Sequence, residues 1–106
     1  MKNINDLMKK ARELQDKMEK IEVELNALEV EGSSSGDLVK AKVTGKLEVV
    51  SLEIAPSLIE ANDKEMLEDL IIAAIRDAQN KARAIASEKF AELGLPGGMG
   101  GVGFPN

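Results

Sequence analysis

Residues 38–54, LVKAKVTGKLEVVSLEI, decide the fold, because apolar and polar side chains alternate along two segments of this stretch. In the first segment Val39, Ala41 and Val43 occupy alternate positions, with lysines between them. A period of two residues is typical of a β-strand that buries one face. The stretch therefore predicts a hairpin of two antiparallel strands with one apolar and one polar face.

The second segment and its flanks complete this hairpin. Gly45-Lys46 fits a two-residue type II′ turn with glycine at its first position. Alternate apolar side chains of the second strand are expected on one face: Val50, Leu52 and Ile54. Val49 is expected on the opposite face with the polar residues. Pro56 ends the strand, and residues 57–60 are expected to form one helical turn.

A long amphipathic helix is predicted before the hairpin, over residues 4–28. Its apolar positions alternate in steps of three and four residues, as in a helix that packs lengthwise on another helix. These positions, called the seam below, are Ile4, Leu7, Ala11, Leu14, Met18, Ile21, Leu25 and Leu28. Asn3 is the expected N-cap. Residues 27–32, ALEVEG, fit either the end of this helix or the start of a strand, and residues 32–37, GSSSGD, have the composition of a loop.

A second long helix is predicted after the hairpin. Asn62 as N-cap and Glu65 three residues later form a capping-box arrangement. The apolar face of this helix is formed by Met66, Leu67, Leu70, Ile71, Ala74, Ile75, Ala78, Ala82 and Ile85. Gly94 is expected to end the helix as a left-handed residue. We therefore expect one folded domain over residues 1–95 and a flexible Gly/Pro-rich tail over residues 96–106.

The composition argues against catalysis and against insertion into a membrane. The 106 residues include no cysteine and no histidine, so the chain lacks thiolates and the commonest general base and metal ligand. The N-terminus is charged from residue 2 onward, unlike a signal peptide, and the longest apolar run, 70–75, is far shorter than a membrane span. The sequence therefore predicts a cytoplasmic protein that is not an enzyme, with no cofactor, metal, small-molecule substrate or membrane partner.

The two predicted helices are too long for the hairpin to cover. Helices of about 25 and 31 residues extend about 38 and 46 Å, whereas strands of about six residues span about 20 Å. The seam nevertheless stays apolar along the whole first helix. We therefore expect a two-fold homodimer in which a second copy covers the overhang. A monomer whose two helices pack against each other is the alternative.

Positive charge is concentrated in three short regions of a chain whose net charge is −5. The residues that could contact the phosphates of a nucleic acid are Lys9, Lys10 and Arg12 on the first helix, Lys40, Lys42 and Lys46 on the hairpin, and Arg76, Lys81 and Arg83 on the second helix. Lysines that are simply solvated and that discourage edge pairing of a strand are the alternative explanation for the hairpin group. The acidic net charge also argues against tight nonspecific binding of DNA.

The order of elements and several stretches resemble the YbaB/EbfC family of bacterial nucleoid-associated proteins. The matching stretches are LMKKARELQDKMEKIEVEL, LEVEGSSSGDLVKAKVTGKLEVVSLEI, PSLIEANDKEMLEDLIIAAIRDAQNKA and the Gly/Met/Pro-rich end of the chain. The resemblance implies an α+β fold of order α-β-β-β-α, in which residues 27–32 supply the first strand and long helices flank a small antiparallel sheet. It also implies a homodimer with projecting helices that binds double-stranded DNA in the cytoplasm, alters its conformation and contributes to nucleoid organisation and gene regulation.

Two other functions fit the same order of elements. A prefoldin-like holdase also carries a hairpin between paired helices, and an adaptor would use the seam to bind a helix of another protein. Salt separates these functions, because DNA affinity falls steeply as salt rises whereas binding of an apolar client does not.

Overall fold

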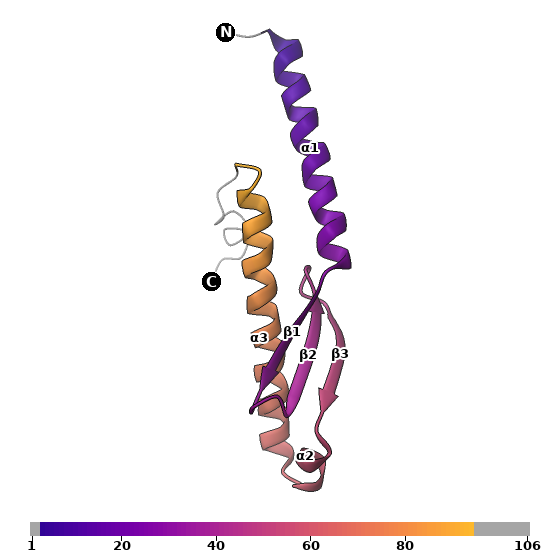
Figure 1. Cartoon of the computed structure of the whole chain (residues 1–106), viewed down its shortest axis with the longest axis vertical. Helices are drawn as coiled ribbons and strands as arrows, with labels where there is room; N and C mark the ends of the chain where they lie inside the picture. Colours follow the sequence, from indigo (N-terminus) through magenta and orange to yellow (C-terminus); the bar gives the residue numbers. More distant parts are fainter. Residues whose placement is uncertain (1–2, 95–106) are drawn as a thin grey trace.

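The computed structural model describes residues 3–94, which form a three-stranded antiparallel sheet, two long helices and one short helix (Figure 1). The elements are α1 (Ile4–Ala27), β1 (Glu29–Ser34), β2 (Val39–Thr44), β3 (Val49–Ile54), α2 (Pro56–Glu60) and α3 (Lys64–Ala91). The predicted α+β fold, with long helices flanking a small sheet, is confirmed. The stretch 27–32, which fits helix or strand by sequence, completes α1 and then enters β1. Residues 96–106, predicted to be a flexible tail, lie outside the described residues.

The core lies between α3 and the face of the sheet formed by β1 and β2 (Figure 1). The alternate β2 residues predicted to be buried, Val39, Ala41 and Val43, are at most 1% exposed. They face α3, on which a row of alanines is fully buried: Ala74, Ala78 and Ala82. The apolar face of β2, which follows a period of two residues, thus packs against the apolar face of α3, which follows the helical period, as the sequence predicts.

Small residues bring the backbones of α3 and β1 unusually close together. A Cβ atom placed on Gly32 of β1 would lie 2.1 Å from the backbone nitrogen of Ala78 and 2.7 Å from the carbonyl oxygen of Ala74. No side chain fits between the strand and the helix at this point, so glycine is required there.

The strand β3 forms one edge of the sheet and lies beyond the part that α3 covers. Its register places Leu52 and Ile54 on the side that faces α3, as predicted. A bulge in the same ladder puts Val49 rather than Val50 opposite Val43, which corrects the predicted faces of these two valines. Three apolar side chains of this strand remain 42–49% exposed: Val49, Val50 and Leu52.

The opposite edge, β1, is closed by α3. The backbone N–H of Ser33 donates to Oδ2 of Asp77 at 3.0 Å, and Oγ of Ser34 donates to the carbonyl oxygen of Leu70 at 2.6 Å. The first bond occupies a backbone N–H of the edge strand, and the second ties the end of the strand to α3, so both oppose pairing with another chain at this edge. The two edges of the sheet therefore differ, since one is covered and the other is open.

The helix α1 projects from the end of the molecule as an arm (Figure 1). Every residue from Asn3 to Lys20 is exposed, and only Ile21 and Leu25 of this helix are buried. The molecule accordingly measures 68 × 26 × 16 Å, with a radius of gyration of 18.9 Å. A compact chain of about 100 residues has a radius of gyration of about 13 Å. Most of the predicted seam thus has no cover within one chain.

The predicted N-cap of the second long helix is wrong by one residue. Asp63 caps α3, because its Oδ1 accepts the backbone N–H of Met66 at 3.1 Å. Asn62 has a φ of 56° and turns the chain between α2 and α3. Asparagine tolerates this left-handed conformation better than most residues, which leaves the capping position to the aspartate.

The predicted type II′ turn is also wrong. The loop has three residues, 45–47, because the N–H of Thr44 donates to the carbonyl of Glu48 at 2.8 Å, and its left-handed residue is Leu47, with a φ of 74°, rather than Gly45. Gly45 serves a different purpose. Its N–H donates to the carbonyl of Leu25 at 2.9 Å, and a Cβ atom there would lie 2.7 Å from the same oxygen.

Of the other predicted helix ends, the start of α1 is confirmed and the end of α3 is confirmed only in part. Oδ1 of Asn3 accepts the N–H of Asp6 at 2.9 Å and caps α1. Gly94 is left-handed as predicted, with a φ of 83°, but α3 already ends at Ala91, with Glu92 as its C-cap. The cap of α1 depends on residues adjacent in the sequence, which is why local reasoning finds it.

Candidate nucleic-acid interface

The first group of predicted phosphate contacts lies on the projecting arm. Lys9, Lys10 and Arg12 are exposed, and none of them forms an ion pair with any residue between 3 and 94. At a rise of 1.5 Å per residue, Lys9 lies about 24 Å along the helix from the buried Leu25. These three cations are therefore held clear of the body of the molecule and are available to an external anion.

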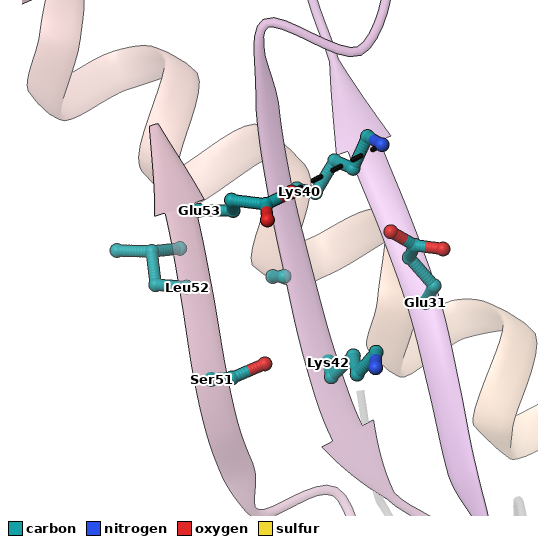
Figure 2. Close-up of a pocket in the computed structure, with 7 residues that line it drawn as sticks. Glu31, Lys40, Lys42, Ser51, Leu52 and Glu53 are labelled. Carbon is teal, nitrogen blue, oxygen red and sulfur yellow. Dashed lines mark ion pairs between the residues drawn. The ribbon is translucent and has the colours of Figure 1, made fainter. Parts of the chain in front are cut away.

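Two lysines of the second group, Lys40 and Lys42, lie on the outer face of the sheet, away from α3 (Figure 2). Nζ of Lys40 lies 4.0 Å from Oε1 of Glu53 on β3. The register places Lys42 between Glu31 of β1 and Ser51 of β3. A shallow hollow between these side chains is lined by both lysines and both glutamates. The lysine strip, which has no acid along the sequence, thus becomes a mixed surface of balanced charge in the fold.

Lys46, the third lysine of the hairpin, points toward the base of the arm. Its Nζ lies 3.3 Å from Oε2 of Glu22 on α1. On the C-terminal part of α3, Nζ of Lys89 lies 3.1 Å from Oε1 of Glu24. Both glutamates precede the end of α1 by less than two turns, so each lysine joins the arm to a different element of the body.

The third group lies on α3. Arg76 is exposed and has no ion pair within residues 3–94, whereas Nζ of Lys81 lies 3.0 Å from Oδ2 of Asp77. The N–H of Ser33, and then the ammonium of Lys81, hold the pKa of Asp77 below its ordinary value. Nη1 of Arg83 donates to Oδ1 of Asn80 at 2.9 Å. The two arginines are seven residues apart and share the outward face of the helix.

The nine predicted residues do not converge on one patch of the chain. They lie on the arm, on the outer face of the sheet, in the β2–β3 loop at the base of the arm, and on α3. The structure adds two exposed cations that the sequence analysis did not select, Lys17 and Lys20 of α1, which have no ion pair within the described residues. The spacing of seven between Lys10 and Lys17, which puts both on one helix face, is the signal that points to Lys17.

Other kinds of site find no support in the part of the chain that the structure describes. Across residues 3–94, no group of three or more acidic side chains is arranged to hold a metal ion. Over the same residues, no helix combines the length and the apolar character needed to cross a membrane.

Comparison with known proteins identifies the family. A family model described as the YbaB/EbfC DNA-binding family matches residues 1–99. A nucleoid-associated protein of Rhizobium meliloti is 48% identical over 98 residues, which cover 91% of this chain and 92% of the relative. A nucleoid-associated protein of Agrobacterium fabrum shows the same identity and the same coverage of both chains.

A solved structure supports the fold independently. An uncharacterized protein from Helicobacter pylori superimposes with a TM-score of 0.77 at 19% sequence identity, over 88% of this chain and 98% of that one. The match therefore extends over both long helices as well as the sheet. The chain belongs to the YbaB/EbfC DNA-binding family of nucleoid-associated proteins.

Proposed function

We propose that this chain forms a homodimer that binds double-stranded DNA in the cytoplasm, alters the conformation of the DNA and so contributes to nucleoid organisation and gene regulation. The role is not enzymatic. The observation that carries the proposal is the group Lys9, Lys10 and Arg12, which has no ion pair with residues 3–94 and lies on the arm of a chain from a DNA-binding family. Cations without internal partners can replace the counterions of DNA without first breaking an ion pair.

The homodimer is supported by apolar surface that one chain leaves open. On the arm, Ile4 is 68% exposed, Leu7 is 51% exposed and Met18 is 37% exposed. The seam to which they belong continues into the buried Ile21 and Leu25, so the exposed and buried parts form one stripe. The open edge of β3 adds a second apolar surface. A second copy carries the same seam and the same edge, and a two-fold axis would bring like surfaces together.

The proposed effect on DNA conformation follows from the arms. In a two-fold dimer, two projecting helices would contact phosphates at separate points along one duplex. DNA must then adopt the spacing and direction that the two arms impose, at a deformation cost that the phosphate contacts offset. Arg76 and Arg83 would add contacts from α3. Smaller contributions are proposed for the candidates that already have a carboxylate neighbour: Lys40, Lys42, Lys46 and Lys81.

The experiment compares two triple variants that remove the same charge. One replaces Lys9, Lys10 and Arg12 by alanine, and the other replaces Lys40, Lys42 and Lys46. Binding to a fluorescent duplex of mixed sequence is measured by anisotropy at several salt concentrations, with sedimentation to report the oligomeric state. Each lost phosphate contact should reduce the slope of log affinity against log salt by about 0.9.

The arm variant should lose most of the affinity and most of the salt slope, whereas the hairpin variant should lose less of both. Equal losses in the two variants would contradict the assignment of the arm as the main contact. A protein that stays monomeric at high concentration, or that binds duplex DNA with no dependence on salt, would contradict the proposed function itself.

A further inference from the structure

The base of the arm is held on two sides by ion pairs. Glu22 and Glu24 lie on either side of the buried Ile21 and Leu25, since a rotation of about 100° per residue places them on opposite flanks of that stripe. Glu22 is paired with Lys46 of the β2–β3 loop at 3.3 Å. Glu24 is paired with Lys89 of α3 at 3.1 Å. We call these two pairs the clasp.

Within one chain, the clasp adds to few other contacts at the base of the arm, which are the buried side chains of Ile21 and Leu25 and the hydrogen bond from the N–H of Gly45 to the carbonyl of Leu25. Within residues 3–94, no other ion pair joins α1 to the rest of the chain. The buried contacts of Ile21 and Leu25 occupy little more than one turn, and the helix extends about 25 Å beyond them. A small rotation at the base therefore moves the far end of the arm by a much larger distance.

Both lysines of the clasp are accessible to a competing anion. The side chain of Lys46 is 40% exposed and that of Lys89 is 28% exposed. A phosphate oxygen and a carboxylate oxygen are equivalent acceptors for an ammonium group, so a DNA backbone near the base of the arm competes directly with the two glutamates. Ion pairs as exposed as these are weak and are screened by salt, which lets a polyanion displace them.

We propose that Glu22 and Glu24 are internal competitors of DNA phosphate, and that DNA binding opens the clasp and frees the arm to change its angle. The inference deepens the proposed function and rests on it. In the free protein the clasp favours one direction of the arm and pairs two cations with carboxylates. In the complex Lys46 and Lys89 exchange carboxylate for phosphate, and the arm adjusts to the duplex.

The first test measures DNA affinity of Glu22→Gln and Glu24→Gln against the control Glu19→Gln. Each change removes one negative charge from α1, and Glu19 is exposed without an ion pair among the described residues. Glu19 is also nearer to the arm cations, so its general electrostatic effect should be at least as large. Removing a competitor that forms an exposed ion pair should raise affinity about two- to fivefold beyond the control.

The second test measures the arm without DNA. The chain has no cysteine, so Gln15→Cys on α1 and Ala84→Cys on α3, both exposed positions, accept spin labels at defined sites. Doubly labelled chain is diluted into excess unlabelled protein, and the distance between labels is measured by pulsed electron–electron double resonance. The distribution should be narrow at low salt, broaden when Glu22→Gln and Glu24→Gln are combined, and change when duplex DNA is added to the unmodified protein. Glu19→Gln should leave it narrow.

The outcomes separate the inference from the function on which it rests. Unmodified protein that binds no duplex DNA would overturn both. Normal DNA binding, with Glu22→Gln and Glu24→Gln no tighter than Glu19→Gln, would overturn the competition between carboxylate and phosphate. A distribution of label distances that is identical with and without the two glutamates would overturn the role of the clasp in directing the arm.

Discussion

Replacing Gly32 by alanine tests the close approach of α3 to the sheet, on which the packing of the whole body depends. The added Cβ would lie 2.1 Å from the nitrogen of Ala78, 2.6 Å from its Cα and 2.7 Å from the carbonyl oxygen of Ala74. All of these are backbone atoms, so no change of side-chain rotamer relieves the overlap. The strand and the helix must move apart instead.

The cost can be worked from these distances. An ordinary contact begins near 3.4 Å, so β1 and α3 would have to separate by about 1.3 Å. Overpacking a core costs about 1–3 kcal/mol, and a clash with fixed backbone belongs at the upper end, so we expect a loss of about 3 kcal/mol in the free energy of unfolding. For a domain of this size, that loss lowers the melting temperature by roughly 12–24 °C.

The assay is thermal and urea unfolding followed by circular dichroism at one fixed protein concentration, since the stability of an oligomer depends on concentration. Gly36→Ala is the control. Gly36 has a φ of 63° and no atom within 4 Å of an added Cβ, so alanine there carries only the left-handed backbone cost of about 1–2 kcal/mol. If Gly32→Ala proves no more destabilising than Gly36→Ala, the backbones are not in contact and the reasoning fails.

Three further changes test other parts of the structure. Because the pKa of Asp77 is lowered in the folded state, its stabilisation is fully present above the ordinary aspartate pKa of about 3.9 and is lost as pH falls through the folded pKa. The free energy of unfolding of the unmodified protein in urea should therefore exceed that of Asp77→Asn by less below about pH 4 than at neutral pH. A difference in stability that stays constant with pH would contradict a lowered pKa for Asp77. Leu25 is only 5% exposed, so Leu25→Ala should lower the free energy of unfolding, measured in urea, by about 2–4 kcal/mol. The exposed control Asn26→Ala should lower it far less, and similar losses in the two variants would refute the packing at the base of the arm. Leu52→Lys on the apolar side of β3 should shift the protein toward monomer in sedimentation velocity, and Ser51→Lys on the opposite face should not; an unchanged mass for Leu52→Lys would place the proposed dimer contact elsewhere.

Sequence reasoning succeeds where adjacent residues determine the outcome. The alternation of Val39, Ala41 and Val43 predicts the buried face of β2, and Asn3 predicts the start of α1. It fails where neighbouring residues are equally suited to a local role. Asn62 and Asp63 can both cap a helix, and the choice follows from the turn that the chain makes after α2.

The loop at Gly45 shows a second kind of failure. Glycine is the residue expected in a left-handed turn position, and the sequence offers no other reason for it. The reason lies in the carbonyl of Leu25, which is twenty residues earlier in the chain and lies against this glycine in space. A contact of this kind cannot be read from periodicity or from composition.

For the candidate cations, the sequence predicts the surroundings on the arm but not those on the sheet. The candidate cations of α1 are exposed in the fold, and none of them has an ion pair among residues 3–94. The lysines of the hairpin acquire their acidic neighbours from other elements: Glu31 from β1, Glu53 from β3 and Glu22 from α1. Counting charges along the sequence omits these partners, since they depend on strand register and on the direction of α1.

The unequal edges of the sheet also limit how these molecules can polymerise. An open strand invites recruitment of another chain, and a sheet with two open strands can extend into a fibril. Here Ser33 and Ser34 on β1 are already engaged by α3, so recruitment through β1 would first require the helix to detach. In the proposed dimer, pairing of two β3 edges would leave only the two β1 edges of this sheet outside, where α3 opposes further pairing, so growth would stop at two subunits.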